Sequence, residues 1–116
     1  MLKGIKIFID WLLNPLVSYF DKPYFVEFVE DPVDDPLKKV LYIIGTQNEV
    51  WQVEMLCPCG CAEKIVLPAN EETSPRWTIK VNSTGVPSLS PSVWRSKGCK
   101  SHFFLRLGRI KWCENV

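Results

Sequence analysis

Residues 40–61 read VLYIIGTQNEVWQVEMLCPCGC, and this stretch decides how the rest of the chain is interpreted. It opens with Val40–Gly45, a short, apolar and β-branched run that is typical of a buried strand. After a polar turn, Val50–Met55 alternates between large apolar residues and the polar pair Gln52 and Glu54. This alternation predicts a second strand with two different faces. The strand leads directly into a turn that contains three cysteines.

The same reasoning predicts five further strands outside this stretch. They are Tyr24–Glu30, Lys64–Leu67, Trp77–Val81, Phe103–Leu107 and Arg109–Trp112. The last two are joined tightly at Gly108. The segment from Ser83 to Gly98 is rich in Ser, Pro and Gly, which predicts an irregular loop. We therefore expect a mainly β (α+β) fold over residues 21–116, in the form of a small, mostly antiparallel domain with a zinc-binding turn.

Residues 1–20, MLKGIKIFIDWLLNPLVSYF, are strongly apolar, but Lys3, Lys6, Asp10 and Pro15 interrupt the run that a membrane-spanning helix needs. A clean apolar stretch with a small-residue cleavage site is lacking, so we expect no secretory signal. The apolar residues follow helical spacing, which predicts an N-terminal amphipathic helix that ends near the proline. This helix would pack on the domain or on a partner, and attachment to a membrane surface is the alternative.

The composition restricts the class of protein. The chain has 116 residues, 47% of them hydrophobic, which is typical of one soluble globular domain. The formal net charge is +1, from 14 Lys and Arg against 13 Asp and Glu, so nucleic acid is not an expected partner. An odd number of cysteines, five, without a secretory signal indicates a reducing compartment rather than a disulfide framework. We therefore expect a cytoplasmic protein.

The turn Cys57-Pro58-Cys59-Gly60-Cys61 could wrap closely around a metal ion. Zinc prefers four thiolate or imidazole ligands in a tetrahedron, and proline and glycine allow a tight turn. A fourth ligand could come from Cys99-Lys100-Ser101-His102. The predicted ligands of a structural Zn²⁺ are Cys57, Cys59, Cys61 and Cys99, with Cys113 as the spare cysteine. Two alternatives stay open, namely that His102 replaces one cysteine of the turn and that the cysteines are buried free thiols.

His102 is the only histidine, and it could act as a catalytic base. About ten residues upstream, Ser88–Val93 forms a proline-stiffened loop that could present a hydroxyl group to the imidazole, as nucleophilic serine chemistry requires. Ser101 adjoins His102 and would point to the opposite face of a strand. Ser92 is therefore the better partner, and Ser90 is the next choice. The alternative for Ser92 is a role as a helix or turn cap.

Two motifs, Cys57-Pro58-Cys59-Gly60-Cys61 and Cys99-Lys100-Ser101-His102-Phe103, are the most specific part of a longer pattern over residues 24–113. The accompanying elements are Leu41-Tyr42-Ile43-Ile44-Gly45, Trp51, Ile65, Leu67, Trp77, Ser90-Pro91-Ser92-Val93, Gly108-Arg109-Ile110 and Trp112. This pattern resembles a family of small bacterial proteins. Its members are encoded beside a ubiquitin-like protein and homologues of activating and conjugating enzymes, in phage-defence operons. Phe104 departs from the pattern, in which a tryptophan-like aromatic is expected.

The resemblance implies a serine-type peptidase that trims or releases the ubiquitin-like protein. It implies Ser92 as nucleophile, His102 as base, and the four cysteines as ligands of a metal that fixes the turns of the site. The expected partners are the ubiquitin-like protein and the enzyme homologues. Two other readings stay open. One is a non-catalytic zinc-binding adaptor in the same pathway, and the other is a metallopeptidase with His102 as a ligand and one coordination position open to water.

Overall fold

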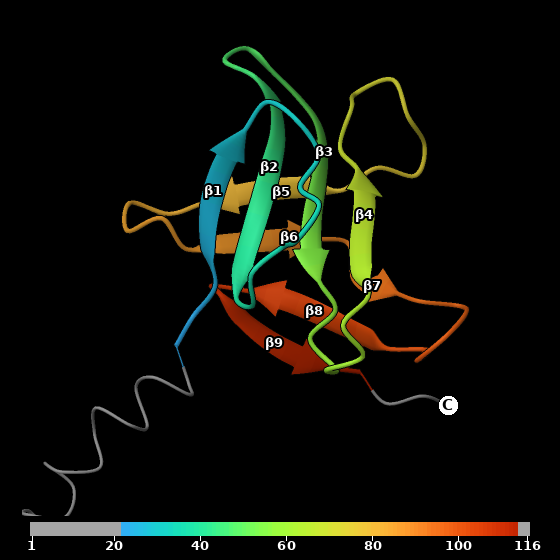
Figure 1. Ribbon diagram of the computed structural model, residues 1–116. Coiled ribbons are helices and arrows are strands. Elements are labelled where there is room, and N and C mark those ends of the chain that lie inside the picture. Colours follow the sequence, from blue (N-terminus) through green and yellow to red (C-terminus); the bar gives the residue numbers. More distant parts are fainter. Residues whose placement is uncertain (1–21, 114–116) are drawn as a thin grey trace, which may run out of the picture.

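The computed structural model describes residues 22–113, which form nine strands in three sheets (Figure 1). Sheet A contains β1 (Phe25–Val29), β2 (Val40–Thr46), β3 (Glu49–Leu56) and β4 (Lys64–Pro68) in that order. Sheet B contains β5 (Thr78–Val81) and β6 (Pro87–Ser90), and sheet C contains β7 (Val93–Trp94), β8 (His102–Arg106) and β9 (Arg109–Trp112).

Helices are absent from this part of the chain, so none of its segments is a helix that could span a membrane. The helix predicted for residues 1–20 lies outside the described residues. The prediction of a small, mostly β domain with antiparallel sheets is confirmed for residues 22–113.

One hydrophobic core joins the three sheets. In Figure 1 the strands of sheet A stand upright, β5 and β6 run across behind them, and sheet C lies below. Buried side chains from all three sheets meet in the core, namely Leu41, Ile43, Val53, Met55, Ile65, Leu67, Leu89, Val93, Phe103 and Leu105. In β2, β3, β4 and β8 these side chains come from alternate positions, so the period-two pattern of the sequence builds most of the core directly.

Sheet A contains one parallel pair in an otherwise antiparallel arrangement. β2 pairs antiparallel with β3, and β3 with β4, whereas β1 pairs parallel with β2. A parallel pair needs a connection that returns along the sheet. Glu54, only 1% exposed, anchors this connection by accepting a hydrogen bond from Val33 N (2.9 Å) and pairing with Lys64 Nζ (3.2 Å). Lys64 Nζ also donates to the carbonyl of Val33 (2.9 Å).

The irregular loop predicted from Ser83 to Gly98 is wrong, because this segment contains β6 and β7. β6 pairs antiparallel with β5, and β7 pairs antiparallel with β8. Pro87 is the first residue of β6, a position at which a strand tolerates proline. Leu89 and Val93 are buried, so these short strands are held by tertiary packing that their Ser- and Pro-rich composition conceals.

Gly108 is the point at which the three sheets are tied together. It forms the tight β8–β9 turn that the sequence predicts, with a φ of 75°. Gly108 N donates to the carbonyl of Pro87 in β6, and Tyr24 N, just before β1, donates to the carbonyl of Gly108, both at 2.8 Å. A Cβ atom at this position would lie 2.6 Å from Val86 Cγ1. The turn therefore needs glycine both for its backbone conformation and for the close approach of its neighbours.

Candidate active site

Ser92 and His102 lie side by side in sheet C. Ser92 immediately precedes β7 and His102 opens β8, and the register pairs Val93 with Phe103 and Trp94 with His102. This pairing leaves Ser92 Oγ 3.0 Å from His102 Nε2, with both residues half-buried. In the imidazole tautomer protonated at Nδ1, the serine hydroxyl donates to Nε2. This is the geometry in which a histidine can accept the proton of a serine nucleophile.

Neither of the other two candidate serines takes this position. Ser101 is 7% exposed, and its Oγ lies 3.1 Å from Cys99 Sγ and 3.7 Å from Cys57 Sγ. Its side chain therefore faces the cysteines, as expected from the alternation of neighbouring residues beside a strand. Ser90 is the exposed last residue of β6.

Two tryptophans flank the serine–histidine pair. The indole of Trp94 stacks on the imidazole of His102, with ring centroids 5.5 Å apart and an interplanar angle of 25°. Trp77 Nε1 donates to the backbone carbonyl of Ser92 at 3.3 Å. Of the two tryptophans, Trp77 serves in the sequence analysis as a marker of a strand and of the family pattern. Their contacts with the pair depend on the packing of β7 against β8 and of the β4–β5 connection against Ser92.

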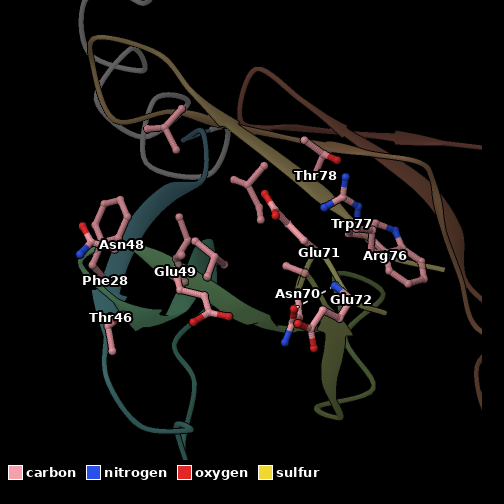
Figure 2. A pocket seen from close by; sticks show the side chains of 15 residues that line it. Phe28, Thr46, Asn48, Glu49, Asn70, Glu71, Glu72, Arg76, Trp77 and Thr78 are labelled. Atoms are coloured by element: carbon pink, nitrogen blue, oxygen red, sulfur yellow. Dashed lines mark hydrogen bonds between the residues drawn. The ribbon is translucent and has the colours of Figure 1, made fainter. Parts of the chain in front are cut away.

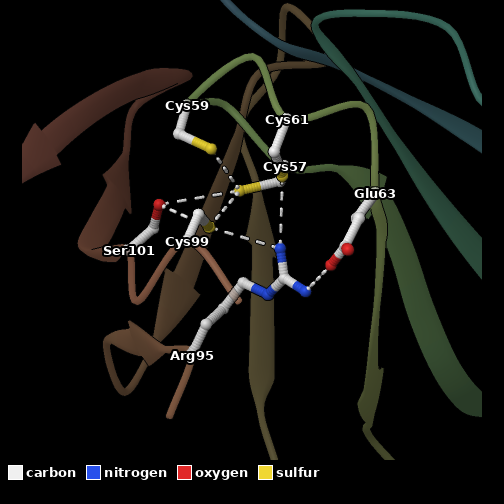
Figure 3. A network of polar contacts seen from close by, with 7 residues as sticks. All are labelled: Cys57, Cys59, Cys61, Glu63, Arg95, Cys99 and Ser101. Atoms are coloured by element: carbon white, nitrogen blue, oxygen red, sulfur yellow. Dashed lines mark hydrogen bonds and ion pairs between the residues drawn. The ribbon is translucent and has the colours of Figure 1, made fainter. Parts of the chain in front are cut away.

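Four cysteines gather at the junction of sheets A and C (Figure 3), and they are Cys57, Cys59, Cys61 and Cys99. Their Sγ atoms all lie within 4.8 Å of one another. Cys57 Sγ is 3.4 Å from Cys59 Sγ and 3.6 Å from Cys99 Sγ. Four thiolates bound tetrahedrally at about 2.3 Å from zinc lie about 3.8 Å apart. The cysteine cluster thus has the donor set and the spacing to hold such a metal ion, without His102 or Cys113.

The β3–β4 turn supplies three of these thiols. Cys57 N donates to the carbonyl of Glu63 at 2.8 Å, which closes the turn. Gly60 and Ala62 have φ values of 93° and 65°, so the backbone reverses sharply between the cysteines. Cys99 reaches the same point from the β7–β8 connection, which also carries Ser101 and leads to His102. The cluster therefore joins sheet A to the strand that bears the histidine.

The guanidinium of Arg95 and the hydroxyl of Ser101 lie close to the sulfur atoms of the cluster. Arg95 Nη1 lies 3.4 Å from both Cys61 Sγ and Cys99 Sγ, and Nη2 pairs with Glu63 (Figure 3). Hydrogen bonds from the side chain and the backbone of Ser101 lower the pKa of Cys99 to about 6. The thiolate, which is the form that binds metals, is thereby favoured at neutral pH. The sequence analysis missed Arg95 and Glu63, which lie 32 positions apart and follow no recognised ligand spacing.

A groove of about 730 Å³ lies on another part of the molecule (Figure 2). It is lined by residues of the β2–β3 turn, the β4–β5 connection and β5, including Glu49, Glu71 and Arg76. Neither Ser92 nor His102 lines it. Trp77 connects the groove to the serine–histidine pair, because it lines the groove and its Nε1 donates to the carbonyl of Ser92.

Fold and site together define a small β protein in which a serine–histidine pair adjoins a four-cysteine cluster. The family model of BubE, described as the bacterial ubiquitination-like system serine protease, matches residues 25–113, and the chain belongs to this family. This match confirms the resemblance drawn from the cysteine-rich and Ser-His motifs. The curated proteins and the solved structures that were compared gave no significant match.

Proposed function

We propose that the chain is a serine-type peptidase that cuts the C-terminal tail of a bacterial ubiquitin-like protein. The observation that carries the proposal is the 3.0 Å separation between Ser92 Oγ and His102 Nε2. It occurs in a chain whose family is named as the serine protease of a bacterial ubiquitination-like system. The name of this system supports a ubiquitin-like protein as the substrate.

In this mechanism Ser92 Oγ attacks the carbonyl carbon at the end of the mature tail while His102 Nε2 takes the hydroxyl proton. The tetrahedral intermediate collapses as the imidazolium returns this proton to the leaving amine. Water then attacks the acyl-serine ester with His102 again as base, which releases the tail carboxylate and restores the serine. An extended tail could approach along an exposed strand edge by main-chain pairing.

In the same proposal the cysteine cluster holds a structural Zn²⁺. Four thiolates complete the tetrahedron that zinc prefers, so this donor set favours a closed structural site over one with a position open to water. His102 Nε2 faces Ser92 instead of the sulfur atoms. The donor set and this orientation favour the serine mechanism over a metallopeptidase. When bound, the ion would cross-link the β3–β4 turn to the β7–β8 connection.

The decisive experiment is intact-mass analysis of a ubiquitin-like precursor from such a bacterial system, after incubation with the wild type and with Ser92→Ala. We expect the wild type to remove a C-terminal fragment and Ser92→Ala to leave the precursor whole, because the nucleophile is lost. Ser90→Ala is the matched control, since Ser90 is exposed and lies two residues away. It should cut at close to the wild-type rate.

Other results would redirect the proposal. Cleavage by both the wild type and Ser92→Ala would keep the peptidase but remove Ser92 as nucleophile. An unchanged precursor with a folded, metal-loaded wild type would favour the adaptor, which should instead bind the ubiquitin-like protein or its conjugating enzyme. We extend the proposal to the cytoplasm, because clustered thiols need a reducing compartment to stay available for a metal. We extend it to antiviral defence on the resemblance to a family encoded in phage-defence operons.

A further inference from the structure

We propose that Trp94 is the positioning residue that holds the His102 imidazole in line with Ser92. The consequence for catalysis depends on the peptidase function proposed above, whereas the effect on the ring itself does not. The inference begins with the strand register. Trp94 and His102 are directly opposite one another in the antiparallel pair of β7 and β8. Opposite residues point to the same face of a sheet, with their Cβ atoms about 5 Å apart.

The stacked geometry covers one face of the imidazole. The two ring centroids are 5.5 Å apart and the planes are inclined by 25°. An indole in this position opposes rotation of the imidazole about its χ2 bond, a torsion that is otherwise broad. The ring plane in turn determines whether the lone pair of Nε2 points at Ser92 Oγ.

Other restraints on the imidazole are few. Within residues 22–113, Ser92 Oγ is the only hydrogen-bond partner of the His102 ring, and no carboxylate of this segment pairs with it. In serine proteases of the Ser-His-Asp type, a buried carboxylate holds the histidine in its tautomer and orientation. Here the stacked indole of Trp94 supplies a contact that restrains the orientation of the His102 ring, the proposed base.

Trp94 can be altered without removing part of the core. Its side chain is 69% exposed, so truncation leaves the buried residues of the three sheets in place. The test compares Trp94→Ala, which removes the stacking, with Trp94→Phe, which keeps an aromatic ring. Trp51→Ala is the matched control, because Trp51 is a half-exposed tryptophan on β3 of another sheet.

The kinetic prediction is a lower kcat with an unchanged KM. For Trp94→Ala we expect kcat for cleavage of the precursor to fall about twofold to tenfold, the factor that an aromatic pair corresponds to. Trp94→Phe should recover most of the loss, and Trp51→Ala should match the wild type. A higher KM with an unchanged kcat would overturn the proposal and assign Trp94 to substrate binding.

A second readout needs no activity. Since His102 is the only histidine, its ring ¹⁵N signals can be read without ambiguity in the full chain. We expect the Nδ1-protonated tautomer in the wild type and Trp94→Phe, and averaging between tautomers in Trp94→Ala. Unchanged ring signals in Trp94→Ala would overturn the positioning role. Absence of cleavage by the wild type would refute the proposed function alone, because the ring signals would still report whether Trp94 orients the imidazole.

Discussion

At the scale of single residues, two serines near His102 have different contacts, one being close to it in space and the other its neighbour in the sequence. Ser92 approaches the imidazole, and Ser101 turns toward the sulfur atoms of Cys57 and Cys99. The preference for Ser92 came from the alternation of side chains along a strand, and the observed geometry follows that rule. The roles of Ser92 as nucleophile and His102 as base stay predictions.

The cysteines offer a residue-scale test of metal binding. Cys99→Ser should lower the metal content of the purified protein well below one equivalent, because the cluster would lose its only thiolate from the β7–β8 connection. Cys113→Ser is the matched control, since Cys113 lies outside the cluster, and it should retain the wild-type content. Elemental analysis of metal per chain measures both variants. Equal metal loss in the two would contradict the assignment of the ligands.

At the scale of elements, the β8–β9 turn is sensitive to a single added carbon. In Gly108→Ala the new Cβ would meet Val86 Cγ1 at 2.6 Å and Pro23 Cβ at 2.8 Å, in a backbone with positive φ. We expect the free energy of unfolding to fall by about 2–5 kcal/mol, as strain and overpacking add. Denaturant titration measures the loss.

Gly85→Ala is the control for this turn. Gly85 also has a positive φ, 83°, but the nearest atom to its added Cβ is a side-chain carbon of Phe25 at 3.8 Å. Its cost should therefore be the conformational part alone, about 1–2 kcal/mol. If both variants lost the same stability, the close approach at Gly108 would not matter.

At the scale of the whole molecule, the cysteine cluster links two sheets that otherwise meet through the hydrophobic core. Because a bound ion stabilises only the folded chain, removing it with a chelator should cost about 3 kcal/mol where the metal exceeds its Kd a hundredfold. In a domain of this size we expect Tm to fall by about 10–20 °C. Scanning calorimetry with and without chelator measures the shift.

Activity followed in the same samples distinguishes a structural ion from a catalytic one. With a structural site, cleavage of the ubiquitin-like precursor should decline together with the folded fraction, and it should return when Zn²⁺ is restored. Loss of cleavage in a protein that stays folded at the wild-type Tm would instead support the metallopeptidase alternative.

The sequence by itself determined most of the strands and the three-cysteine turn. Both depend on local features, namely the alternation of apolar residues and the conformations that proline and glycine allow between neighbouring residues. The same local reasoning failed for β6 and β7, whose short Ser- and Pro-rich segments become strands only because β5 and β8 offer them hydrogen-bond partners.

Only the tertiary structure decided which distant side chains meet. It brings Cys99 within 3.6 Å of Cys57 across 42 residues, and it adds Arg95 and Glu63 to the sulfur atoms. It also stacks Trp94 on His102 and places Ser92 Oγ within hydrogen-bond distance of that ring. Such contacts have no fixed spacing along the chain, because they arise from how three sheets pack around one core.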